Sequence, residues 1–125
     1  MSKTRGQLEA EISDAMVRFE LDYMGRGPEE ARTYIIEDLV VVRLRGVLTQ
    51  AEKQLAGVDG TIQGWALVKE IRRELIEKAR PLLETIVHDV TGQEVRSLHT
   101  DISTRIGERI IVFSLAGPVR LTIDT

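Results

Sequence analysis

The sequence contains no cysteine, few aromatic residues and no long apolar run. With 0 Cys among 125 residues, disulfides, thiolate metal sites and thiol chemistry are all excluded. A membrane-spanning helix needs about 20 consecutive apolar residues, whereas the comparable stretches here are as short as residues 39–42. We therefore expect no membrane-spanning segment.

An excess of positive charge is also missing. The net charge is -3, and the aromatic residues number only five, one Trp, two Tyr and two Phe, so the chain lacks the basic footprint and stacking groups of a nucleic-acid binder. Residues 1–6 lead into an acidic amphipathic stretch rather than the apolar core of a signal peptide. The prediction is a cytoplasmic protein.

The length and composition are those of one globular domain. Apolar residues make up 42% and charged residues 30% of the chain, as in soluble domains. We expect a single domain over residues 1–125, in which residues 115–125 form either an extra edge strand or a tail.

Helical periodicity marks three segments. Residues 7–24 form an amphipathic pattern that Gly25 and the following Gly-Pro end, and Arg26 in that loop is a candidate anion contact. Thr49 and Glu52 have capping-box spacing ahead of a short helix over residues 50–56. A main helix over residues 65–92 contains Pro81, which predicts a kink or, alternatively, two helices meeting there. Its expected buried stripe comprises Trp65, Val68, Ile71, Leu75, Ala79, Leu82, Ile86 and Val90.

Two pairs of β-branched segments predict two hairpins, over residues 32–36 with 39–44 and over residues 95–104 with 110–115. The fold class is therefore α+β: an antiparallel sheet of four to five strands, packed against an N-terminal helix and a long Pro-kinked helix. The strands are apolar on both faces, and two helices do not supply cover for both, so we expect a homodimer.

The second hairpin carries a polar pair. His99 and Asp101 lie two residues apart in a strand and therefore share a face. A three-residue loop ending at Gly107 would place His99 opposite Phe113 and Asp101 opposite Ile111. A structural or interface pair is the favoured interpretation, because no activated nucleophile is identifiable.

Other candidate sites have simpler explanations. With His88 and His99 as the available imidazoles, at no ligand spacing, neither a metal nor any other cofactor is predicted. The arginines of the main helix, including Arg72, alternate with glutamates, which is typical of a solvated, charged helix face.

Several blocks resemble the bacterial MpsC-like family. They are Gly25-Arg26-Gly27-Pro28, residues 42–49 with 51–53, residues 72–75 through 79–82, and residues 97–104 leading to Gly107-Glu108-Arg109. The resemblance spans residues 6–115. It implies an accessory component of a sodium-translocating, membrane-potential-generating system, in some genomes associated with uptake of inorganic carbon. Such a component would lie peripheral to the inner face of the membrane, through a partner. The resemblance transfers no catalytic residues.

Two functions remain open at this point. The leading hypothesis is a non-enzymatic, dimeric accessory or regulatory protein that docks onto a membrane-bound assembly. The alternative is a sensor or enzyme for a small anion such as bicarbonate or phosphate, in which His99 and Asp101 converge with Arg43 and Arg45. Arg43 and Arg45 share a strand face, but only the strand order decides whether the four residues meet.

Overall fold

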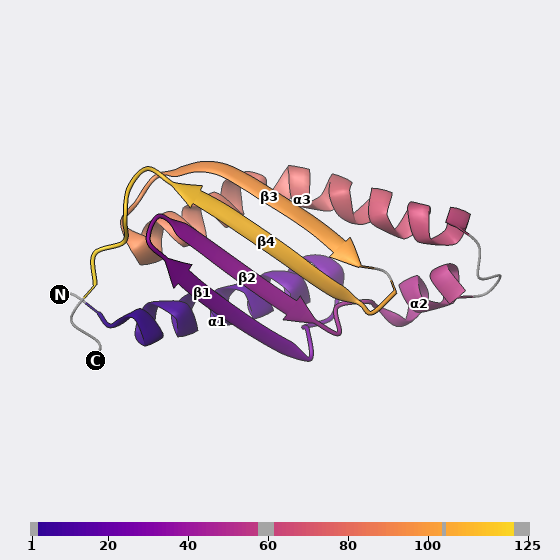
Figure 1. Cartoon of the computed structure of the whole chain (residues 1–125). Helices are drawn as coiled ribbons and strands as arrows, with labels where there is room; N and C mark the ends of the chain where they lie inside the picture. The colour runs from indigo at the N-terminus through magenta and orange to yellow at the C-terminus, as the bar shows by residue number, and fades with distance from the viewer. Residues whose placement is uncertain (1–2, 58–61, 104, 122–125) are drawn as a thin grey trace.

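The computed structural model describes residues 3–57, 62–103 and 105–121 (Figure 1). The described residues form three helices and four strands, in the order helix, two strands, two helices, two strands, which confirms the α+β class and both hairpins. In chain order they are α1 (Arg5–Met24), β1 (Glu30–Ile36), β2 (Leu39–Arg45), α2 (Gln50–Gly57), α3 (Ile62–Thr91), β3 (Val95–Ser103) and β4 (Glu108–Leu115).

The four strands form one antiparallel sheet in the order β1-β2-β4-β3. The two hairpins therefore meet through their second strands. Figure 1 shows α1 and α3 on the same side of this sheet. Burial alternates along β2 and β4 as a sheet with one covered face requires.

The ends of α1 follow from local chemistry. The Thr4 hydroxyl accepts a hydrogen bond from the Gln7 N–H, and the Gln7 side chain accepts one from the Thr4 N–H, which completes a capping box. At the other end Gly25 adopts a left-handed conformation with φ 79°, and its N–H donates to the carbonyl of Leu21 at 3.1 Å. The predicted stop at Gly25 is confirmed.

The core lies between the helices and the covered face of the sheet. Its fully buried members come from α1, α3, β2 and β4 and include Ile12, Met16, Val40, Val42, Leu44, Ile76, Leu83, Val87, Ile111 and Phe113. The expected stripe of α3 is partly wrong, because Ile71 and Leu82 are exposed whereas Ile76 and Leu83 are buried. The helix presents a neighbouring face to the sheet, rotated from the one that the periodicity predicts.

The second hairpin differs from prediction by one residue. His99 lies opposite Val112 and Asp101 opposite Ile110, rather than Phe113 and Ile111. Paired residues share a side of the sheet, and Phe113 is fully buried, so its partner must be the buried Leu98 and not an outward side chain. Gly107 does adopt the left-handed conformation, with φ 67°. Glu108 pairs with Ser103 rather than with Thr104, the partner that a three-residue loop at residues 105–107 implies.

Pro81 lies inside α3, which is a single helix, so the alternative of two helices is wrong. The angle of the predicted kink stays a prediction. The segment 116–121 forms no strand and is a tail, anchored by the buried side chain of Val119. The Val119 N–H donates to the carbonyl of Glu37 at 3.3 Å.

One outer edge of the sheet is partly capped by α1. The carboxylate of Glu9 accepts a hydrogen bond of 2.8 Å from the backbone N–H of Ile35 in β1. Ser13 on the same helix bonds Thr33 through their hydroxyls at 2.8 Å. Because an open strand edge invites pairing with another chain, these contacts protect β1 from edge-to-edge association.

Adjacent leucines of α3 provide a test of the helix orientation. We expect Leu83→Ala to lower the free energy of unfolding by about 2–5 kcal/mol, since it empties a fully buried position. Leu82→Ala, at a position 40% exposed, should cost less than about 1 kcal/mol. Urea unfolding followed by circular dichroism measures both values, and equal losses would contradict the orientation.

Candidate functional site

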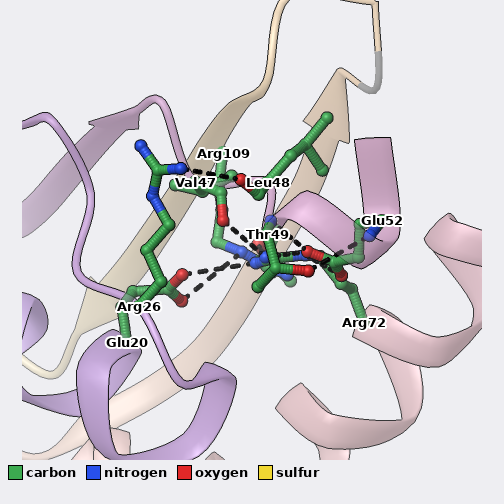
Figure 2. A network of polar contacts seen from close by, with 9 residues as sticks. Glu20, Arg26, Val47, Leu48, Thr49, Glu52, Arg72 and Arg109 are labelled. Atoms are coloured by element: carbon green, nitrogen blue, oxygen red, sulfur yellow. Dashed lines mark hydrogen bonds and ion pairs between the residues drawn. The ribbon is translucent and has the colours of Figure 1, made fainter. Parts of the chain in front are cut away.

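Three charged side chains lie in the core, one on each of α1, α3 and β4. Glu20 and Arg72 are 0% exposed and Arg109 is 2% exposed. Charged groups are almost never fully buried unless they are paired, so this cluster is the most unusual chemical feature of the described chain. Figure 2 shows the three side chains converging beside the start of α2.

Arg72 is the centre of the cluster. Its Nε and Nη2 donate to the two carboxylate oxygens of Glu52 at 2.8 and 2.6 Å, a bidentate pair. Nη1 donates to Glu20 at 3.2 Å, and Nη2 also donates to the carbonyl of Val47 at 2.7 Å. One guanidinium thus joins α1, α2, α3 and the loop that follows β2.

Glu52 both pairs with Arg72 and caps the N-terminus of α2. Its carboxylate accepts a hydrogen bond of 2.8 Å from the N–H of Thr49, whose hydroxyl accepts one from the Glu52 N–H at 3.2 Å. The predicted capping box is confirmed. Burial raises the pKa of Glu52, but the hydrogen bonds from Arg72 and Thr49 outweigh it, so the pKa lies below its ordinary value of 4.5. Glu52 is therefore ionised at neutral pH.

Arg109 is held less completely. Its Nη1 donates to the Thr100 hydroxyl at 3.2 Å, while its Nε lies 4.0 Å from Oε2 of Glu20, too far for a hydrogen bond. Nε and Nη2 of Arg109 and Oε2 of Glu20 find no hydrogen-bond partner among the described residues. Burial raises the pKa of Glu20 and lowers that of Arg109 to about 10, so Arg109 remains charged at neutral pH.

The expectation that Arg72 lies on a solvated helix face is wrong, because its side chain is fully buried. A usable signal existed: Arg72 is four residues from both Val68 and Ile76, on the stripe that is buried. Glu20 likewise follows Met16 by four residues, and Arg109 alternates with the buried Ile111. The residues of this site are thus charged residues that keep the spacing of the buried apolar stripes. Arg72 was assigned to the exposed face because glutamates are its neighbours in the sequence.

His99 and Asp101 share the face of the sheet opposite the helices, but they do not bond each other. Nε2 of His99 contacts the Ser97 hydroxyl at 3.2 Å, whereas Asp101 accepts from the Ile102 N–H at 2.8 Å and pairs with Lys69 at 3.3 Å. The hydrogen bond from Ile102 and the contact with Lys69 lower the pKa of Asp101. The carboxylate is thus committed elsewhere and does not orient the imidazole.

The strand order separates the remaining predicted residues from this pair. Arg43 and Asp101 are both paired with Ile110, on opposite sides of β4, so β4 separates their strands. The Nε of Arg43 donates a hydrogen bond to Glu108 at 2.7 Å. Arg45 contacts Glu30 at 3.2 Å and Glu108 at 3.5 Å. The four residues of the predicted anion site therefore do not converge.

Arg26 lies near the buried cluster instead (Figure 2). Its Nη1 donates to the carbonyl of Leu48 at 3.4 Å, and its Nη2 contacts Glu29 at 3.1 Å. The loop at residues 25–28 thus braces the segment that leads into α2.

The described residues offer neither a cluster of metal ligands nor a membrane-spanning helix. Within residues 3–57, 62–103 and 105–121, His, Asp and Glu side chains nowhere gather in threes as a metal ion would require. Over the same residues, every helix is too short or too polar to cross a bilayer.

Removal of Arg72 should strongly destabilise the protein. We expect Arg72→Met to lower the free energy of unfolding by about 3–5 kcal/mol, because Glu20 would remain buried without its main partner. The neighbouring Arg73→Met is a matched control, since Arg73 is exposed and should change stability by less than about 1 kcal/mol. Adding Glu20→Gln to Arg72→Met should recover part of the loss, and further destabilisation would contradict the pairing.

The lowered pKa of Glu52 predicts a pH signature. Ionised Glu52 stabilises the fold above its ordinary pKa of 4.5, and this contribution is lost as the pH falls through the lower folded value. The stability difference between the parent and Glu52→Gln should therefore be full at pH 6–7 and shrink below about pH 4.5. Urea unfolding between pH 7 and 3 measures it, and a constant difference across that range would refute the assignment.

Comparison with known proteins identifies the family of the chain. The family model described as "Na+-translocating membrane potential-generating system (MpsC)" matches residues 4–117. A curated relative, the uncharacterized protein YbcI of Bacillus subtilis (strain 168), is 39% identical over 124 residues, covering 99% of this chain and 98% of YbcI. No solved structure matches the chain. With nearly its whole length matched, the chain belongs to the MpsC family.

Proposed function

We propose that this chain is a non-enzymatic, cytoplasmic accessory or regulatory subunit of a membrane ion-transport system, and that it works as a homodimer. Membership of the MpsC family carries the proposal, because the family description names a sodium-translocating, membrane-potential-generating system. A chain whose described helices do not span a membrane would act there by docking onto membrane components.

The sheet provides a surface for the dimer contact. We define the open face as the apolar side chains of β1, β2 and β4 on the side opposite the helices: Tyr34, Ile36, Leu39, Val41, Ile110 and Val112. Charged side chains of the same strands, among them Arg32, Arg43 and Glu108, lie beside them on that side. Tyr34 is 41% and Ile36 52% exposed. Contiguous apolar surface of this kind is typical of protein interfaces.

A second copy of the chain fits this face. The Glu9 contact on β1 disfavours association through that strand edge, and the apolar open face favours stacking of one sheet on another. A two-fold axis along the strands, between β2 and β4, would lay Val41 of one copy over Val112 of the other. It would also bring exposed Arg32 toward Asp101 of the second copy, a pair of opposite charge.

The polar residues of β3 support a role without catalysis. Ser97 and His99 form a hydrogen-bonded pair, yet Asp101 is held by Lys69 and the backbone of Ile102. A Ser-His-Asp relay needs the carboxylate on the imidazole, and that contact is absent from this strand.

Complementation in cells tests the proposal. We expect deletion of the gene to lower the sodium-dependent membrane potential and the parent chain to restore it. Val112→Glu, which places a charge at the centre of the open face, should yield a monomer by size exclusion with light scattering and fail to restore the potential.

The matched control is Leu67→Glu on α3, a position 48% exposed and away from the open face. It should remain a dimer of about twice 14.1 kDa and restore the potential. A parent that is monomeric across micromolar concentrations would refute the dimer, and an unchanged potential in the deletion strain would refute the transport role.

A further inference from the structure

An apolar groove lies between α1 and α3, on the side of the sheet opposite the open face. Its volume is about 410 Å³. The apolar part of its lining consists of Ala15, Phe19 and Tyr23 of α1 with Leu82 and Ile86 of α3. Leu82 is 40% and Tyr23 48% exposed, so the groove opens to solvent.

The groove has the dimensions of a helix contact. Ala15, Phe19 and Tyr23 follow one another at four-residue steps, and Leu82 and Ile86 are likewise four residues apart. Four residues make about one helical turn, so the apolar lining extends along α1 for ~12 Å. The ring of Tyr23 stacks on the buried ring of Phe19 with their centroids 4.8 Å apart. Such a groove accommodates an amphipathic helix with apolar residues at positions i, i+3, i+4 and i+7.

Charged side chains of α1 border the groove. Asp14, Arg18 and Asp22 also follow one another at four-residue steps, so the charges along this rim alternate as negative, positive, negative. Elsewhere on the helices charged neighbours form ion pairs, such as Arg80 with Glu77 at 3.0 Å. The three rim side chains are exposed and have no hydrogen-bond or ion-pair partner within the described part of the chain. They are therefore available to a binding partner.

The order of the rim charges selects that partner. A negative-positive-negative row has the same order in both directions along α1. A second copy of the chain, related by a two-fold axis at Arg18, would oppose Asp14 to Asp22 and Arg18 to Arg18. Opposed like charges suppress a contact, so the rim disfavours a second copy in this groove. A helix of another chain with the row positive, negative, positive would instead oppose unlike charges at all three positions.

We propose that this groove is the docking site for an amphipathic helix of the membrane component. The helix lays its apolar stripe into the groove and a positive-negative-positive row of side chains, one turn apart, against the rim. The source of the helix rests on the proposed function, whereas the chemistry of the groove does not. The open face lies on the other side of the sheet, so the groove stays accessible in both copies of the dimer.

Binding of a synthetic helix to the full chain tests this proposal. The probe is a labelled amphipathic peptide with leucines on one face and Lys, Glu and Lys one turn apart along its flank. The control peptide carries Glu, Lys and Glu there, and compensating charges on the far face keep both peptides neutral. We expect saturable binding of the probe by fluorescence anisotropy at about 0.15 M ionic strength, and binding of the control peptide at least about fivefold weaker.

Two variants assign the contact to the groove. Leu82→Ala should weaken binding of the probe about fivefold to tenfold, because it removes apolar contact from the centre of the groove. Leu67→Ala is the matched control, 48% exposed on the same helix but outside the groove, and should change affinity less than about twofold. A triple variant, Asp14→Lys with Arg18→Glu and Asp22→Lys, reverses the rim and should prefer the control peptide. Absence of probe binding, equal affinities for the two peptides, unchanged affinity in Leu82→Ala or an unreversed preference in the triple variant would each overturn the proposal.

The assay in cells separates this proposal from the proposed function. The triple variant changes only exposed side chains, so it should fold and remain a dimer, unlike Val112→Glu, yet fail to restore the sodium-dependent membrane potential. Full restoration would overturn the docking site, and so would loss of the dimer, which would assign the groove to contact between copies. An unchanged potential in the deletion strain would refute the transport role, and the peptide measurements would still decide whether the groove binds a helix.

Discussion

The buried guanidinium of Arg72 is the interaction on which the arrangement of helices and loops depends. It bonds Glu52 of α2, Glu20 of α1 and the carbonyl of Val47, so three segments are fixed to α3 at one point. Burial of ionised groups is expensive, and bidentate geometry is what offsets that cost. Apolar packing alone tolerates small rotations of a helix about its axis. These hydrogen bonds restrict such rotations more strongly, because they depend on distance and direction.

The same cluster connects the helical layer to the sheet. The N–H of Val47 donates to the carbonyl of Gly107 at 3.1 Å, in the turn before β4, and Arg109 follows two residues later. The loop after β2 is therefore held by Arg72 through the Val47 carbonyl and by the turn before β4 through the Val47 N–H.

Local chemistry made most of the elements predictable. Gly25, the Thr49 and Glu52 capping box and the alternation of β2 each act within a few residues, so their signals survive in the sequence. The predicted register of the second hairpin was wrong, because the loop length was inferred from Gly107 alone. The burial of Phe113 sets the pairing. The cluster around Arg72 was not predicted, because its charged side chains were expected to be exposed to solvent.

The sequence by itself determined the fold class, the two hairpins, the positions of the helices and the family. Only the tertiary structure decided the strand order, which keeps Arg43 away from His99, and the pairing of Arg72 with partners 20 and 52 residues away. The physical reason is the separation of the interacting residues along the chain. Periodicity and capping depend on residues that are close in sequence, whereas the partners of a buried charge are residues that only the packing of helices and sheet brings together.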